Sequence, residues 1–123
     1  MTLDTRSKIL PPSRAAEFAG AVFVAMHLDP LTASHARRLR QIAAGGKPLV
    51  VLLTNPPSPL LPSSARAELA AALESVTAVM VLNGGVATIP EVARPSLIIE
   101  EAADLERRQT LVRRVFDRHA ATA

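Results

Sequence analysis

The sequence predicts an α/β fold in which a parallel sheet of about four to five strands has helices on both faces. Two observations lead to this fold class. None of the apolar runs alternates polar with apolar residues, as expected for strands that are buried on both sides. Helix-compatible segments separate these runs, which is typical of the crossover connections of a parallel sheet. The runs predicted as strands are residues 20–26, 48–53, 78–82 and 96–99.

The first segments of the chain have local reasons for their conformation. Residues 1–18 form a polar lead-in, in which Ser13 is a suitable N-cap for a short helical turn after two prolines. A helix is predicted over residues 33–44, and the glycine pair that follows it is a common helix stop. The residues on the predicted buried face of this helix are His35, Leu39, Ile42 and Ala43.

Two further helices are predicted, over residues 63–75 and 103–119. The segment 54–59 before the first of them contains three prolines and cannot be regular structure, because proline lacks the N–H donor that a strand or helix needs. The predicted apolar side of helix 63–75 carries Leu69, Ala72, Leu73 and Val76. The apolar residues of the closing helix are Leu105, Leu111, Val112, Val115 and Phe116.

Length and composition indicate one domain, residues 1–123, with an aliphatic core. The chain has no cysteine, which excludes disulfides and thiolate metal sites. It has no signal-peptide-like segment and no apolar run of about 18–20 residues, so we expect a cytoplasmic protein without a membrane partner. The pI of 10.6 reflects a net charge of only +3 in a chain without Tyr or Cys. Because aromatic stacking residues are scarce, we expect no nucleic-acid partner.

Ligands of such a sheet bind outside the carboxyl ends of its strands, as in a Rossmann-like domain. The segment Met26–His35 leads from the first strand through a short turn into a helix. Unpaired N–H groups and the helix dipole make this kind of junction an anion site. Thr32 and His35 would stand beside it. The alternative for His35 is a helix histidine with satisfied hydrogen bonds, packed under the edge of the sheet.

The same segment resembles the signature of the HxGH nucleotidyltransferase superfamily, which includes phosphopantetheine, heptose-phosphate and glycerol-phosphate nucleotidylyltransferases. The residues that match the version with threonine first are Asp29, Pro30, Thr32 and His35, whereas Met26, Leu28 and Ser34 replace a glycine, a phenylalanine and the signature glycine. A second stretch, Leu61–Leu73 followed by Val76–Val81, resembles the Arg-Ala-Glu-Leu helix and next strand of the heptose- and glycerol-phosphate members. Together the two segments cover about residues 20–82.

The resemblance implies a single nucleotidyltransferase-like domain. Such an enzyme transfers a nucleotidyl group from ATP or CTP to a sugar- or alcohol-phosphate, with Mg²⁺, and releases pyrophosphate. By the same resemblance His35 and Thr32 are the catalytic residues, and Asp29, Ser34 and Arg66 bind the nucleotide or its phosphates. No protein metal ligands are expected.

Several of these residues have plainer alternatives. Asp29 could cap the turn, and Arg66 could form a surface salt bridge. His27 lies outside the signature register and is expected to be a solvent-facing turn residue. Glu100 and Glu101 could hold Mg²⁺, but a solvated pair beside a helix start is the more frequent arrangement.

A second function is predicted from what the chain lacks. Family members often place a lysine in the loop after the second strand and a Ser/Thr-Thr stretch before the last helix. Neither is present here, since Glu106-Arg107-Arg108-Gln109 precedes Leu111. The alternative is therefore a catalytically degenerate nucleotide-binding or dimerisation module of the same fold. In either case the chain could form a homodimer. Catalysis would require Arg66, Arg107 or Arg108 to supply the missing charge.

Overall fold

The computed structural model describes residues 4–121 and has the predicted α/β architecture. Among these residues there is one four-stranded sheet, in which every pairing is parallel and the strand order is β3-β2-β1-β4. Its strands are β1 (Val22–Met26), β2 (Leu49–Leu53), β3 (Ala78–Val81) and β4 (Leu97–Ile99). Each begins and ends within two residues of the predicted run. The ends of the predicted domain, residues 1–3 and 122–123, lie outside the described residues.

One face of the sheet is covered by α1 (Ala33–Ala43) and α2 (Ser63–Ala71). The residues that join these helices to the sheet in one core are aliphatic: Val24, Met26, Leu39, Val51, Leu53, Ala67, Ala70 and Val79. The predicted apolar side of helix 63–75 is wrong for Leu69 and Ala72, which are exposed, and correct for Val76, which is buried in this core, and Leu73, which packs against it. The helix ends at Ala71, its buried residues are Arg66, Ala67, Ala70 and Ala71, and Leu69 is 44% exposed.

The other face is covered by two short 3-10 helices, η2 (Pro12–Phe18) and η4 (Glu91–Ser96), and by Ile89, which follows a third, η3 (Gly85–Thr88). Phe23, Met80 and Ala93 are buried in this second core. The lead-in also holds the outer edge of the sheet. After η1 (Thr5–Lys8), Ile9 bridges to Val79, and Lys8 Nζ donates hydrogen bonds to the carbonyls of Leu73 and Val76.

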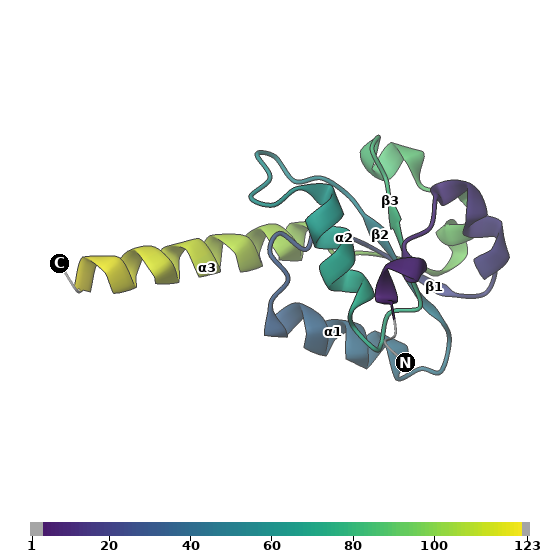
Figure 1. Ribbon diagram of the computed structural model, residues 1–123, viewed down its shortest axis with the longest axis horizontal. Helices are drawn as coiled ribbons and strands as arrows, with labels where there is room; N and C mark the ends of the chain where they lie inside the picture. The colour runs from purple at the N-terminus through teal and green to yellow at the C-terminus, as the bar shows by residue number, and fades with distance from the viewer. Residues whose placement is uncertain (1–3, 122–123) are drawn as a thin grey trace.

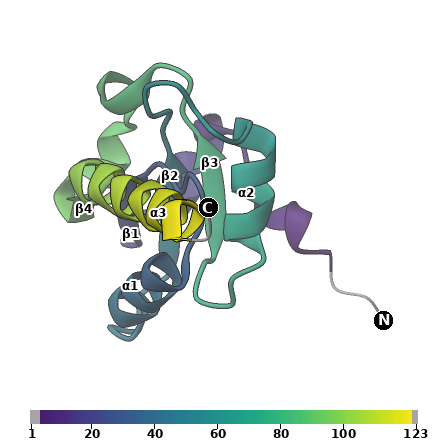
Figure 2. The same ribbon diagram turned by 90° about the vertical axis from the view of Figure 1, so that its left-hand side faces the viewer.

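The last helix, α3 (Glu101–Ala121), starts directly after β4 and leaves the body of the molecule (Figure 1). Seen along this helix, α1 and α2 lie on different sides of its axis, and the C-terminus points away from the sheet (Figure 2). The first turns of α3 are bound to β1 and α1 through Asp104, and its last turns project from the body (Figure 1). In the part of the chain that is described, no helix is long and apolar enough to cross a membrane.

Candidate functional site

The candidate site lies where β1 and β4 end side by side. Their pairing runs from Phe23–Leu97 to Ala25–Ile99, so the loop after β1 and the start of α3 meet at the carboxyl edge. This is also the place where the strand order changes direction, since β2 and β4 lie on opposite sides of β1. Ligands of open α/β sheets bind at such a position.

His35 is 2% exposed, and both of its ring nitrogens have partners. Nδ1 accepts a hydrogen bond from the backbone N–H of Thr32 at 3.0 Å, and the Thr32 hydroxyl lies 2.8 Å from the same nitrogen. Thr32 and His35 thus form a capping box at the start of α1. Because a backbone N–H can only donate, the ring proton belongs on Nε2, which lies 2.8 Å from the Asp104 carboxylate.

Asp104 connects α3 to both β1 and α1. Its carboxylate accepts hydrogen bonds from His35, from the backbone N–H of His27 at 2.8 Å and from Arg107 at 2.8 Å. Burial alone would raise the pKa of the Asp104 carboxyl, but these hydrogen bonds and the charge of its partners outweigh burial and hold that pKa below its ordinary value. Asp104 was not singled out from the sequence.

The prediction for His27 is wrong: the side chain is 4% exposed. The first turn of α3 lies over it, because Asp104 binds its backbone N–H and the Glu101 carboxylate lies 3.0 Å from Nε2. Within the described chain, Nδ1 of His27 is buried without a hydrogen-bond partner. Nor is Glu100 solvated as expected, since it is buried and accepts hydrogen bonds from Arg38 and Arg107.

Arg66 is 1% exposed and is therefore not in a surface salt bridge. Its guanidinium lies under the ends of β1 and β2. The groups that accept hydrogen bonds from it are the carbonyls of Leu61, His27 and Thr54, each at 3.0 Å, and the side-chain oxygen of Asn55 at 2.7 Å. Burial lowers the pKa of Arg66, and the nearby Asp29 carboxylate opposes that effect.

Asp29 binds backbone N–H groups, but those of the loop before α2 rather than those of its own turn as the plainer prediction had it. Its carboxylate accepts hydrogen bonds from the N–H groups of Leu60 and Leu61 at 2.8 and 2.9 Å. Arg108 lies 3.9 Å away and donates to the carbonyls of Pro57 and Ser58. The proline-rich loop is thereby held against the edge of the sheet. We call His27, Asp29, His35, Arg66 and Asp104 the edge cluster.

A groove of about 590 Å³ lies outside the edge cluster, between the start of α1 and α3. Its polar lining residues are Thr32, Ser34, Arg37, Glu106, Arg107, Thr110 and Arg114. Three arginines against one glutamate give it a positive charge. Arg107 is bound to Asp104 and Glu100, whereas Arg37 and Arg114 form no hydrogen bond or ion pair within the described residues.

The five predicted site residues thus form two groups. Thr32 and Ser34 line the groove, with His35 buried directly behind them. Asp29 and Arg66 lie beneath the proline-rich loop, where they bind backbone groups. Sequence reasoning missed Arg37 and Arg114 as groove residues. The signal was weak, because two arginines 77 positions apart meet only after the chain crosses the sheet.

A magnesium ion held by the protein does not fit this edge. The described residues contain no group of three or more potential metal ligands. The carboxylates of Glu100, Glu101 and Asp104 already bind arginine or histidine side chains. The magnesium that the family resemblance implies would have to enter with a nucleotide.

Comparison with known proteins adds no family assignment: no protein-family model matches this chain, and no curated protein matches it.

Proposed function

We propose that this chain is a nucleotide-binding module with a nucleotidyltransferase-like fold, which holds the phosphates of ATP or CTP in the groove between α1 and α3 without transferring the nucleotidyl group. The observation that carries this proposal is the environment of His35. The resemblance makes it the catalytic residue, yet it is 2% exposed and bonded through Nδ1 to Thr32 and through Nε2 to Asp104. It has no ring nitrogen left to donate to a phosphoryl oxygen.

The groove supplies what phosphate binding needs. Arg37 and Arg114 offer planar guanidinium groups, which match phosphate oxygens with two parallel hydrogen bonds. Ser34 adds a hydroxyl group at the start of α1, where the helix dipole and the backbone N–H groups of the first turn favour an anion. Bound phosphates would lie beside the carboxyl ends of β1 and β4.

A catalytic nucleotidyltransferase is the second candidate. The order and spacing of Asp29, Thr32 and His35 at the end of β1 favour it. Nε2 of His35 would then have to release Asp104 and donate to the α-phosphate, while Mg²⁺ entered with the nucleotide and a sugar- or alcohol-phosphate acted as acceptor. Both candidates need the same groove, but only this one needs His35 to move.

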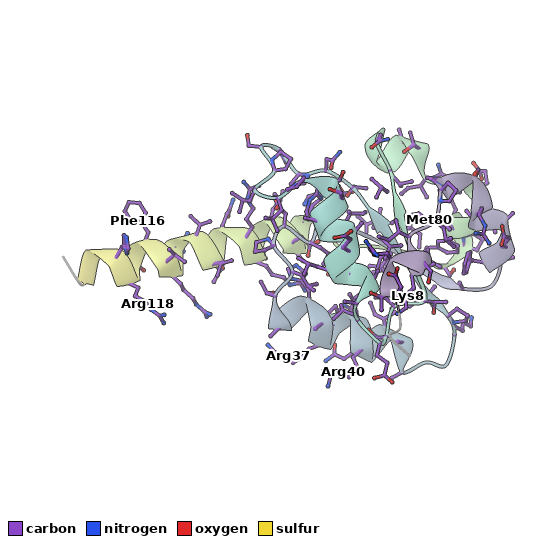
Figure 3. The ribbon with its side chains drawn as sticks, viewed as in Figure 1. Lys8, Arg37, Arg40, Met80, Phe116 and Arg118 are labelled. Carbon is purple, nitrogen blue, oxygen red and sulfur yellow. The ribbon has the colours of Figure 1, made fainter. Side chains whose placement is uncertain are left out.

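Calorimetric titration with ATP and CTP, with and without Mg²⁺, tests binding. We expect Arg37→Ala to weaken binding by about tenfold or more, because a hydrogen bond to a charged group contributes about 1.5–3 kcal/mol. Arg40→Ala is the matched control. Both arginines are exposed on α1, but Arg40 lies outside the groove (Figure 3). Equal losses in the two variants, or no binding by the native chain, would overturn the proposal.

Pyrophosphate release with a panel of sugar- and alcohol-phosphates then separates the two candidates. We expect nucleotide binding without turnover. Turnover by the native chain would replace the binding module with the enzyme. Asp104→Asn would serve as a second variant in that case, because it removes the acceptor charge that holds His35 while leaving the imidazole in place.

A further inference from the structure

We propose that two copies of this chain associate through an antiparallel pairing of their α3 helices, with Phe116 of each copy inserted between Leu105 and Pro57 of the other. The starting point is the part of α3 that leaves the body. We call residues 109–121 the distal helix. Val112 is 48% exposed, Val115 58% and Phe116 74%. Figure 3 shows Phe116 on the part of α3 beyond the body, with its side chain projecting to one side of the helix.

An isolated helix of this length is marginally stable in water and needs an apolar partner for its exposed face. The proximal turns of α3 are held to β1 and α1 by the hydrogen bonds of Asp104. The distal helix has no apolar partner within the described chain that could cover Val112 and Phe116.

The apolar face has the spacing of a coiled-coil seam. Leu105, Gln109, Val112 and Phe116 follow one another at intervals of four, three and four residues, which places them at alternating a and d positions. These residues line a trough of about 690 Å³ that ends against Pro57. Arg108 donates hydrogen bonds to the carbonyls of Pro57 and Ser58 and so fixes the end of the trough.

The trough is complementary to itself in the antiparallel direction. When Phe116 of one copy packs on Leu105 of the other, Gln109 meets Val112, and the same two layers recur in reverse order on the other side of the two-fold axis. Phe116 then enters the end of the trough beside Pro57. A single surface thus supplies both the inserted side chain and the hollow that receives it, as a two-fold interface requires.

Charge also selects the antiparallel direction. The residues that flank the seam are Glu106, Arg108 and Arg113. An antiparallel pair brings Glu106 of one copy beside Arg113 of the other, twice. A parallel pair would instead bring Arg108 beside Arg113, which repel. Glu106 and Arg113 form no ion pair elsewhere in the described residues, so both are available.

The test is a charge exchange in the full chain, with the association constant measured by sedimentation equilibrium from micromolar to several hundred micromolar protein. We expect the native chain to form dimers, and Glu106→Arg or Arg113→Glu alone to weaken association by about tenfold or more. The double exchange should restore it. Arg118→Glu is the control, because Arg118 projects to the side of α3 opposite Phe116 (Figure 3).

A native chain that stays monomeric throughout this range would overturn the proposal, as would single exchanges that have no effect. Single exchanges that weaken association without rescue by the double exchange would overturn the antiparallel direction.

Engineered cysteines give an independent check of how the two helices are aligned, because the native chain has no cysteine of its own. Oxidation of a mixture of Gln109→Cys and Val112→Cys chains should give the mixed disulfide in excess over the two symmetric ones, and an excess of the symmetric Val112→Cys product would indicate parallel helices instead. Binding of a different protein by a monomeric chain would likewise count against a second copy as the occupant.

Discussion

The edge cluster and the distal helix differ in which side chains they bury. In the edge cluster, Arg66 and Asp104 are buried and bonded on several sides, although both carry charge at neutral pH. In the distal helix, Val112 and Phe116 are exposed although they are apolar. Both regions meet in α3, whose first turns belong to the cluster and whose last turns project from the body (Figure 1).

This difference in burial indicates that the two ends of α3 have different roles. Burial of a charge is costly, and it persists only where hydrogen bonds satisfy the charged group. The edge cluster meets that condition within one chain, so we interpret it as the connection that fixes α3 to the sheet. The distal helix leaves its apolar face exposed within the described chain, and the proposed pairing would cover that face with a second copy.

The largest effect is expected where the edge cluster loses a buried charge. Arg66→Ala should lower the free energy of unfolding by about 3–5 kcal/mol, because it leaves buried carbonyls of His27 and Thr54 without a donor. Arg113→Ala in the distal helix is the control and should change it by less than about 0.5 kcal/mol. Urea unfolding of dilute, monomeric protein measures both. Similar losses in the two variants would remove the distinction between the regions.

An intermediate effect is expected for Asp104→Asn, and it should depend on pH. The pKa of Asp104 is lower in the folded chain than in the unfolded chain. Its stabilisation is therefore present above the unfolded value, about 3.9, and is lost as pH falls through the folded value. We expect a loss of about 1.5–3 kcal/mol at pH 7, since hydrogen bonds to a charged group are removed.

Unfolding at pH 7 and at successively lower pH checks this prediction. The difference between the native chain and Asp104→Asn should narrow below about pH 4. Asp117→Asn, at an exposed position of the distal helix, should differ little from the native chain at either pH. A gap for Asp104→Asn that is constant over the whole range would mean that the charge of the carboxylate does not contribute.

The sheet could be predicted from the sequence because its signal is local. Each strand is an uninterrupted apolar run, and the structure places all four within two residues of those runs. The prediction that helices cover both faces also holds, although one face carries 3-10 helices. Such runs need no knowledge of distant residues, since burial on both sides is visible in the run itself.

The polar residues could not be placed in the same way. Hydrophobicity puts Leu69 inside and Arg66 outside, and the structure has the reverse. Arg66 is buried because the carbonyls of His27 and Thr54, which directly follow two different strands, converge on it. His27 is buried because Asp104, 77 residues later, binds its N–H. These partners are separated in sequence by whole elements, so no local pattern indicates them.

The smallest effect is expected for Phe116→Ala in the monomer, and it gives the sharpest comparison between the body and the distal helix. Truncation of a fully buried phenylalanine costs about 3–5 kcal/mol, through lost transfer free energy and the cavity left behind. Phe23, which is 0% exposed, should show that loss. Phe116, which is 74% exposed, has little apolar contact to lose, so Phe116→Ala should change the free energy of unfolding by less than about 0.5 kcal/mol in dilute solution.

At concentrations where the native chain dimerises, the Phe116→Ala variant should become clearly less stable than the native chain, because only the native chain gains stability from association. A large loss in dilute solution would mean instead that Phe116 packs against its own chain, and the contrast between the two regions would disappear.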